Sequence, residues 1–187
     1  RLPCDGDVSF GAGNVSGDSS MLHIEVWNED RWRAGRAEYE ALLARSRSNR
    51  LFLSWDWLTL WWESLTPRQD GDALQVLAVR SGGELIGIMP VFRSVASRRG
   101  LRYRVANLLG GCVRQARGVF SEYLDVVALA GREPEVRNAC VDTLLRTDGY
   151  SEISVATSPA FEEWEAVFRA RGRWRGAYVR VIDRMTS

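Results

Sequence analysis

Residues 74–94 read LQVLAVRSGGELIGIMPVFRS, and this stretch decides the fold class. Two apolar runs, Leu74–Arg80 and Glu84–Ser94, are joined by the short connection Ser81-Gly82-Gly83. A glycine-bearing connection between two strand-like runs favours an antiparallel hairpin, because glycine tolerates the positive φ angles of tight hairpin turns. Pro90 has no backbone N–H to donate, so we expect it to bulge or interrupt the second strand.

The residues before this hairpin predict one strand and two helices. Leu22–Trp27 is typical of a first strand, Asn28 or Asp30 can cap a first helix, and Ser54 can cap a second that Pro67 ends. The apolar positions of the first helix are Trp32, Tyr39, Leu42 and Leu43. Those of the second helix are Trp57, Leu58, Trp61, Trp62 and Leu65, which give it an aromatic face.

Further strands and helices follow the hairpin. The expected strands are Leu101–Leu108, Glu122–Leu129, Tyr150–Ala156 and Trp174–Ile182. One helix should follow Gly131 and another should run from Ser158-Pro159 to Gly172. The loop Gly110–Gly118 is long enough to face a ligand. This order predicts an α/β fold with a mixed, mainly antiparallel central sheet, helices on both faces, and parallel neighbours at the later helix crossovers.

Length and composition indicate one globular domain. The chain has 187 residues, of which 45% are hydrophobic and 26% charged, so it can bury a core without disulfides. We expect residues 21–187 to form this single domain and residues 1–20, rich in Gly, Ser and Asp, to be an appended or disordered tail. No run approaches about 20 apolar residues, so no membrane partner is expected.

Cysteine and histidine usage argues against a metal centre. Cys4, Cys112 and Cys140 form no CxxC pair, and His23 is the single histidine of the chain. An odd number of widely spaced cysteines does not fit a disulfide framework or a thiolate metal site. The sequence therefore predicts no metal and a reducing, cytoplasmic setting.

The charge pattern limits the partners of the protein. The formal net charge is +1, too small for the global field that holds a nucleic acid or an acidic membrane surface. Any anion site must be local, and arginine forks bind phosphate bidentately. The candidate is the stretch that contains Arg93, Arg98, Arg99, Arg102 and Arg104. The alternative interpretation of this stretch is a solvated hairpin.

Glu122, Tyr123 and Asp125 are the candidate catalytic residues. They fall on an expected central strand, where acidic residues are depleted, so at least one should face a cleft or an arginine. Glu122 or Asp125 could accept a proton from an amine, and Tyr123 could protonate a leaving thiolate. An acid that pairs with arginine or caps a loop is the alternative, since structural ion pairs also explain buried acids.

Three motifs carry a family resemblance. They are residues 52–58, FLSWDWL, followed by Trp61-Trp62; residues 87–91, GIMPV; and residues 121–125, SEYLD. In this order and spacing the chain resembles the amino-terminal half of the acetyltransferase-like proteins associated with cellulose and exopolysaccharide synthesis. Those proteins belong to the GNAT superfamily of N-acyltransferases and are similar to Fem-type aminoacyl transferases. The resemblance covers roughly Met21 to Ile182.

The resemblance implies direct transfer of an acyl group from acetyl-CoA or another acyl-CoA to an amine, with no covalent intermediate on the enzyme. Glu122, Tyr123 and Asp125 would then be catalytic, and Arg98, Arg99 and Arg102 would bind cofactor phosphates. The helix that carries Trp57, Trp61 and Trp62 could line a pocket for a saccharide or amino acceptor, since aromatic faces bind such ligands. Core packing is the alternative for these tryptophans, and a surplus of them could mark a docking surface.

One turn favours a non-catalytic interpretation. GNAT enzymes bind the cofactor pyrophosphate at a glycine-rich turn, whereas residues 130–135 read AGREPE, with one glycine, a proline and two acids. The alternative function is therefore a non-catalytic half-domain that packs on a cofactor-binding partner, either a second GNAT-like half or a homodimer mate. An unrelated small-molecule binding domain is a third possibility. The enzyme interpretation requires two neighbouring mid-sheet strands to diverge and leave a slot for pantetheine.

Overall fold

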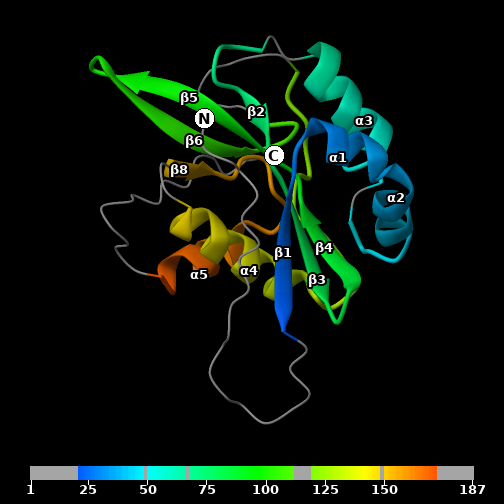
Figure 1. Cartoon of the computed structure of the whole chain (residues 1–187). Coiled ribbons are helices and arrows are strands. Elements are labelled where there is room, and N and C mark those ends of the chain that lie inside the picture. The colour runs from blue at the N-terminus through cyan, green and yellow to red at the C-terminus, as the bar shows by residue number, and fades with distance from the viewer. Residues whose placement is uncertain (1–20, 49, 66–67, 112–118, 148–149, 172–187) are drawn as a thin grey trace.

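The computed structural model describes residues 21–48, 50–65, 68–111, 119–147 and 150–171 (Figure 1). Its strands are β1 (Leu22–Trp27), β2 (Ala73–Leu74), β3 (Val76–Ser81), β4 (Glu84–Met89), β5 (Val91–Arg98), β6 (Leu101–Leu108), β7 (Val127–Ala128) and β8 (Tyr150–Ser154). Its helices are α1 (Glu29–Ala34), α2 (Arg36–Ala44), α3 (Trp55–Leu60), the π-helical turn η1 (Trp61–Leu65), α4 (Glu133–Arg146) and α5 (Phe161–Arg169). No helix in these ranges is long and apolar enough to cross a membrane.

The strands form two sheets, and the chain passes directly from β4 in the first sheet to β5 in the second. The first sheet has the order β1-β3-β4-β7 and the second the order β2-β5-β6-β8. Pro90 lies between β4 and β5, where the chain passes from one sheet to the other, so its predicted interruption of the strand is confirmed. The β6–β8 pair is parallel and the other strand pairs of the described chain are antiparallel. The mixed α/β fold class is thus confirmed, with two sheets in place of one.

Two tight hairpins build these sheets. Ser81 pairs with Glu84 across the β3–β4 turn, and Gly82 and Gly83 both have positive φ angles, as the sequence predicted. The β5–β6 hairpin closes in the same manner at Arg99 and Gly100, with φ angles of 53° and 82°.

Side-chain caps start the helices that were expected. Asn28 Oδ1 accepts a hydrogen bond from Arg31 N at 2.9 Å, and Ser54 Oγ accepts one from Trp57 N at 3.2 Å. The first expected helix is divided into α1 and α2 at Gly35, where a Cβ atom would overlap the Trp27 ring. The absence of a side chain at this position lets β1 and the first helices pack closely.

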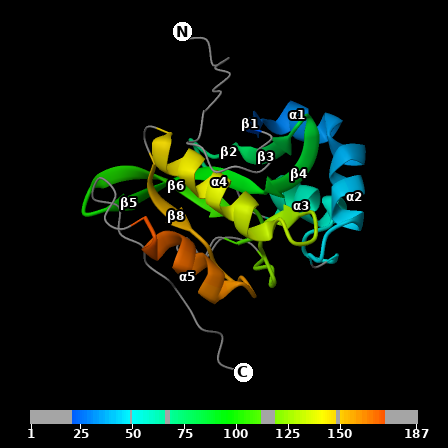
Figure 2. The ribbon, with the colours of Figure 1, turned by 90° about the horizontal axis from the view of Figure 1, so that it is seen from below.

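Helices cover both faces of the strands. Figure 2 shows α1, α2 and α3 together on one side of the molecule, with α4 and α5 packed elsewhere against the sheets. Helix α4 approaches β4 so closely that a Cβ atom on Gly87 would overlap the side chain of Val136. This glycine therefore sets the distance between α4 and the first sheet.

Aromatic residues dominate the part of the core that is formed by α1, α2 and α3. Trp32 stacks on Trp55 with ring centroids 4.0 Å apart, and Tyr39 meets both rings edge-on. The Tyr39 hydroxyl donates to the carbonyl oxygen of Leu53 at 2.7 Å. Because all three rings are buried, this cluster fixes α1 and α2 against the start of α3.

Several sequence expectations change. The strand expected over Glu122–Leu129 is limited to β7, because its first residues form a loop in which Tyr123 has a φ angle of 57°. The closing strand expected over residues 174–182 and the tail 1–20 lie outside the described residues, as does most of the loop Gly110–Gly118. The remaining strands and helices agree in type with the prediction, with shifts at their ends.

Candidate functional site

The segment Val119–Asp125 is held against α3 by a buried serine. Ser121 is fully buried, and its Oγ atom accepts a hydrogen bond from Trp57 Nε1 at 2.8 Å. Its backbone N–H donates to the Gly110 carbonyl at 2.9 Å, and its carbonyl accepts from Thr157 Oγ1 at 2.7 Å. These contacts satisfy the polar groups of Ser121 and make it the anchor of the segment.

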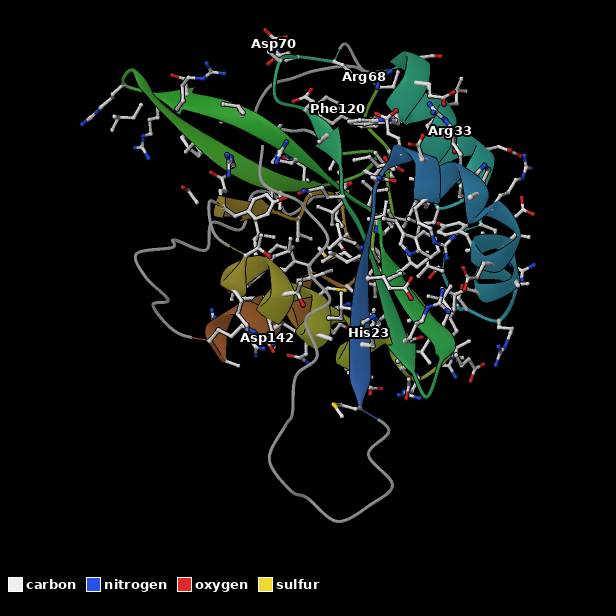
Figure 3. All side chains as sticks on the ribbon, in the orientation of Figure 1. His23, Arg33, Arg68, Asp70, Phe120 and Asp142 are labelled. Carbon is white, nitrogen blue, oxygen red and sulfur yellow. The ribbon has the colours of Figure 1, made fainter. Side chains whose placement is uncertain are left out.

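An aromatic surface lies around this anchor, formed by Phe52, Trp57 and Tyr123. Phe52 stacks on Tyr123 with centroids 6.4 Å apart and meets Trp57 edge-on at 5.3 Å. Tyr123 is 50% exposed. Phe120, the residue before Ser121, is 44% exposed as well, and Figure 3 shows it near α3. The structure therefore joins two of the motifs that carried the family resemblance, residues 52–58 and 121–125, and leaves part of their aromatic area in contact with solvent.

Asp125 is engaged in a buried ion pair. Arg137 of α4 donates from Nε to Asp125 Oδ1 at 3.0 Å and from Nη2 to Oδ2 at 2.5 Å. Trp164 Nε1 of α5 and the backbone N–H of Val126 also donate to Oδ1. Burial alone would lower the pKa of Arg137, but the hydrogen bond and charge of Asp125 outweigh burial and raise it.

This pair fits the structural alternative for Asp125. Its carboxylate accepts four hydrogen bonds, so few lone pairs are left for an incoming amine. Glu122, in contrast, is exposed and makes no hydrogen bond or ion pair within the described part of the chain. Tyr123 belongs to the aromatic surface. The three candidate catalytic residues are thus close together in the sequence, but their side chains do not converge on one point.

The turn after β7 is also satisfied from within. The Gly131 N–H donates to the Glu133 carboxylate at 2.8 Å, and the Arg132 N–H donates to the Leu129 carbonyl at 2.8 Å. The Arg132 guanidinium forms an ion pair with Glu135. Glu133 and Glu135 therefore lie in the first turn of α4, where their negative charges interact favourably with the positive end of the helix dipole. A pyrophosphate would bind at this same end of a helix.

The other predicted ligand-binding residues lie elsewhere. Trp61 and Trp62 are buried and pack against Phe92, so they belong to the core. Core packing, the alternative to a ligand pocket, is therefore confirmed for these two tryptophans. Arg98, Arg99 and Arg102 lie at the exposed end of the β5–β6 hairpin, well apart from the first turn of α4 (Figure 2). The structure does not bring these arginines together with Glu122, Tyr123 or Asp125.

β7 is an edge strand of the first sheet and β8 is an edge strand of the second, and the two do not pair with each other. The segment before β7 and the segment after β8 are joined, because the Leu124 N–H donates to the Thr157 carbonyl at 3.2 Å. Leu124 and Val126 are fully buried beside it. A pantetheine slot between diverging strands stays a prediction.

Two parts of this region were not predicted from the sequence. Arg137 was not assigned, although an arginine next to Val136 and three positions before Cys140 on a helix could have indicated a buried partner for an acid. Phe120 was missed because it stands outside any periodic segment. No pattern in the sequence links Phe52 to Tyr123, which are 71 positions apart (123 minus 52).

No group of three or more histidine, cysteine or acidic side chains in the described ranges could hold a metal ion. Acyl-CoA binding and the acceptor are not tested by the geometry and stay predictions. Comparisons with protein-family models, with curated proteins and with solved structures find no match for this chain, so the GNAT and Fem-type relationship likewise stays a prediction.

Proposed function

We propose that this chain is a non-catalytic GNAT-like half-domain that pairs with a second half through its aromatic surface. The observation that carries the proposal is the engagement of Asp125 by Arg137 and Trp164. A general base must reach the proton of its substrate, and a carboxylate that accepts four internal hydrogen bonds serves packing instead. The domain keeps the scaffold expected of an acyltransferase and uses its acid to join α4 to α5.

The turn at Gly131 supports the same proposal. Cofactor phosphates need free backbone donors at a helix start, and Glu133 already accepts from the Gly131 N–H. A bound phosphate would also stand close to the carboxylates of Glu133 and Glu135, which repel it. The engaged N–H group and the repulsion by the two carboxylates therefore both disfavour cofactor binding at this turn.

The aromatic surface supplies the docking face. Protein interface cores are enriched in Tyr, Trp and Phe and depleted of charge. The side chains of this surface are uncharged, so a second copy placed symmetrically against it meets apolar area and no like charge from these aromatic side chains. The occupant that we propose is accordingly a second copy of this chain, in a two-fold symmetric contact.

Sedimentation velocity of the full chain tests the pairing. We expect a dimer that forms within the micromolar range, and Tyr123→Ser should shift it to monomer because the exposed ring that stacks on Phe52 is lost. Leu101→Ser is the matched control: Leu101 is 76% exposed, likewise uncharged, and lies on the β5–β6 hairpin, so the dimer should persist. A native chain that stays monomeric up to about 100 µM would overturn self-pairing.

Acyl transfer is the second candidate, and the observation that favours it is the missing pairing between β7 and β8. Calorimetry with acetyl-CoA separates the two functions. A half-domain without a cofactor site does not bind acetyl-CoA in the micromolar range, whereas an enzyme binds it there. Because calorimetry and sedimentation measure different surfaces, each part of the proposal can fail separately.

A further inference from the structure

Ion pairs divide the arginines of the described chain into two groups. On the helices and the first sheet, most guanidinium groups face a carboxylate; the pairs include Arg31–Glu38, Arg80–Glu25, Arg132–Glu135, Arg137–Asp125 and Arg171–Asp142. On the β5–β6 hairpin, no ion pair with a described residue forms at Arg93, Arg98, Arg99, Arg102 or Arg104. Positive charge without a carboxylate partner is therefore concentrated on this one hairpin.

The strand register places part of this charge on one face. Val95 pairs with Arg104 across the hairpin, and Arg93 is two residues from Val95, so Arg93 and Arg104 project from the same side. Tyr150 of β8 pairs with Arg104 in parallel register and projects there as well. Arg98 falls on the opposite side by the same alternation. The arginines thus do not form one continuous basic surface.

Tyr150 and Gln75 complete this face at the base of the hairpin. The Tyr150 hydroxyl donates to Gln75 Oε1, and the Gln75 amide nitrogen has no hydrogen-bond acceptor among the described residues. Burial raises the pKa of Tyr150, while the positive charges of Arg93 and Arg104 act in the opposite direction. Hydrogen-bond donors therefore gather at this point without a carboxylate partner for the two arginines.

We propose that Arg93, Arg104 and Gln75 form a binding site for the phosphoryl group of a small soluble molecule. Two guanidinium groups on different strands offer two forks, and the several oxygens of a phosphoryl or diphosphoryl group can meet both, whereas one carboxylate saturates a single fork. The net charge of +1 gives the molecule no long-range field for a polyanion, so recognition depends on these short-range contacts.

Part of this face is exposed to solvent. Figures 1 and 2 show β5 and β6 extending beyond the ends of α4 and α5. Arg104 is exposed and Arg93 is half-buried, with its Nε atom 3.4 Å from the carbonyl of Gly71, so the inner guanidinium is partly oriented before a ligand arrives. The site is separate from the aromatic surface, and the inference stands whether or not the half-domain pairs with a second copy.

Calorimetric titration of the full chain with inorganic pyrophosphate tests the site. We expect binding with a dissociation constant of about 1 mM or tighter and a loss of at least about tenfold in R93Q/R104Q, because each lost fork removes charge-assisted hydrogen bonds. The matched control R98Q/R99Q removes the same charge from the opposite side and the turn of the same hairpin. It should leave the dissociation constant within about twofold of the native value.

Three outcomes would overturn the site. An equal loss in both double variants would assign binding to diffuse charge on the hairpin. No heat from the native chain at millimolar pyrophosphate would remove the site altogether. Binding to phosphatidylglycerol vesicles in the absence of pyrophosphate binding would assign the arginines to a lipid surface. Urea unfolding midpoints of the two variants that match the native midpoint show that binding is compared between folded proteins.

Discussion

The carboxylate of Asp125 and the guanidinium of Arg137 form a bidentate ion pair in which both side chains are nearly excluded from solvent, with 12% and 7% of their surfaces exposed. Asp125 precedes β7 and Arg137 lies one turn inside α4. The pair therefore ties the end of the first sheet to the helix that crosses it. Trp164 extends the tie to α5 through its indole N–H.

Removal of one partner from this pair should destabilise the fold strongly. Asp125→Ala leaves the Arg137 charge buried without a counter-ion, and we expect a loss of about 3–5 kcal/mol in the free energy of unfolding, measured by urea denaturation. The double variant Asp125→Leu with Arg137→Met should recover most of this loss, because no buried charge remains. A urea midpoint in Asp125→Ala equal to that of the native protein would contradict the structural role of the pair. The exposed pair Arg169–Glu165 is the control, and Glu165→Ala should leave the midpoint unchanged.

Gly87 should tolerate no larger residue while Val136 is present. Gly87→Ala adds a methyl group that overlaps Val136, and overpacking of this kind costs about 1–3 kcal/mol. The double variant Gly87→Ala with Val136→Ala makes room for the methyl group. A double-mutant cycle in urea should therefore give a favourable coupling energy between the two sites. Strict additivity of the two single losses would show that α4 does not rest on this glycine.

The backbone at Tyr123 should prefer glycine to alanine. Tyr123→Gly and Tyr123→Ala remove the same stacking contact with Phe52, so the difference between them reports the backbone alone. At a φ angle of 57° a Cβ atom is unfavourable, and we expect the glycine variant to be more stable by about 1 kcal/mol in thermal or urea unfolding. An alanine variant of equal or greater stability would mean that this residue does not adopt the left-handed conformation.

The stability of the protein should fall at alkaline pH because of Tyr39. Burial raises the pKa of this hydroxyl well above its ordinary value, so the folded state keeps a proton that the unfolded chain releases above about pH 10. The contribution is fully present below the pKa of the unfolded state and is lost as pH rises above it. The expected slope is about 1.4 kcal/mol per pH unit.

Tyr39→Phe provides the comparison for this pH dependence. The variant loses the hydrogen bond to Leu53 at every pH, at a cost of about 1 kcal/mol, but it has no proton to release. Its unfolding free energy should therefore fall less steeply than that of the native protein between pH 10 and pH 11 or so. Parallel curves for the two proteins would show that Tyr39 does not titrate differently in the folded state.

Local signals in the sequence were enough to predict most elements of the fold. The glycines at 82 and 83, the caps Asn28 and Ser54, and Pro90 each act on the backbone within a few residues of their own position. Their effects are therefore encoded in short windows and were confirmed. The strand expected over Glu122–Leu129 was wrong over its first half, because alternation cannot reveal a left-handed residue such as Tyr123 inside the run.

The candidate sites depended on contacts that no short window contains. The sequence by itself determined a mixed α/β chain with an arginine-rich hairpin and an acid that needed a partner. Only the tertiary structure decided that Arg137 is this partner, that Phe52 meets Tyr123, and that Arg93, Arg104 and Tyr150 share a face. The physical reason is that capping and turn preferences act between neighbours along the chain, whereas ion pairing and ring stacking act between side chains that folding brings together from distant positions.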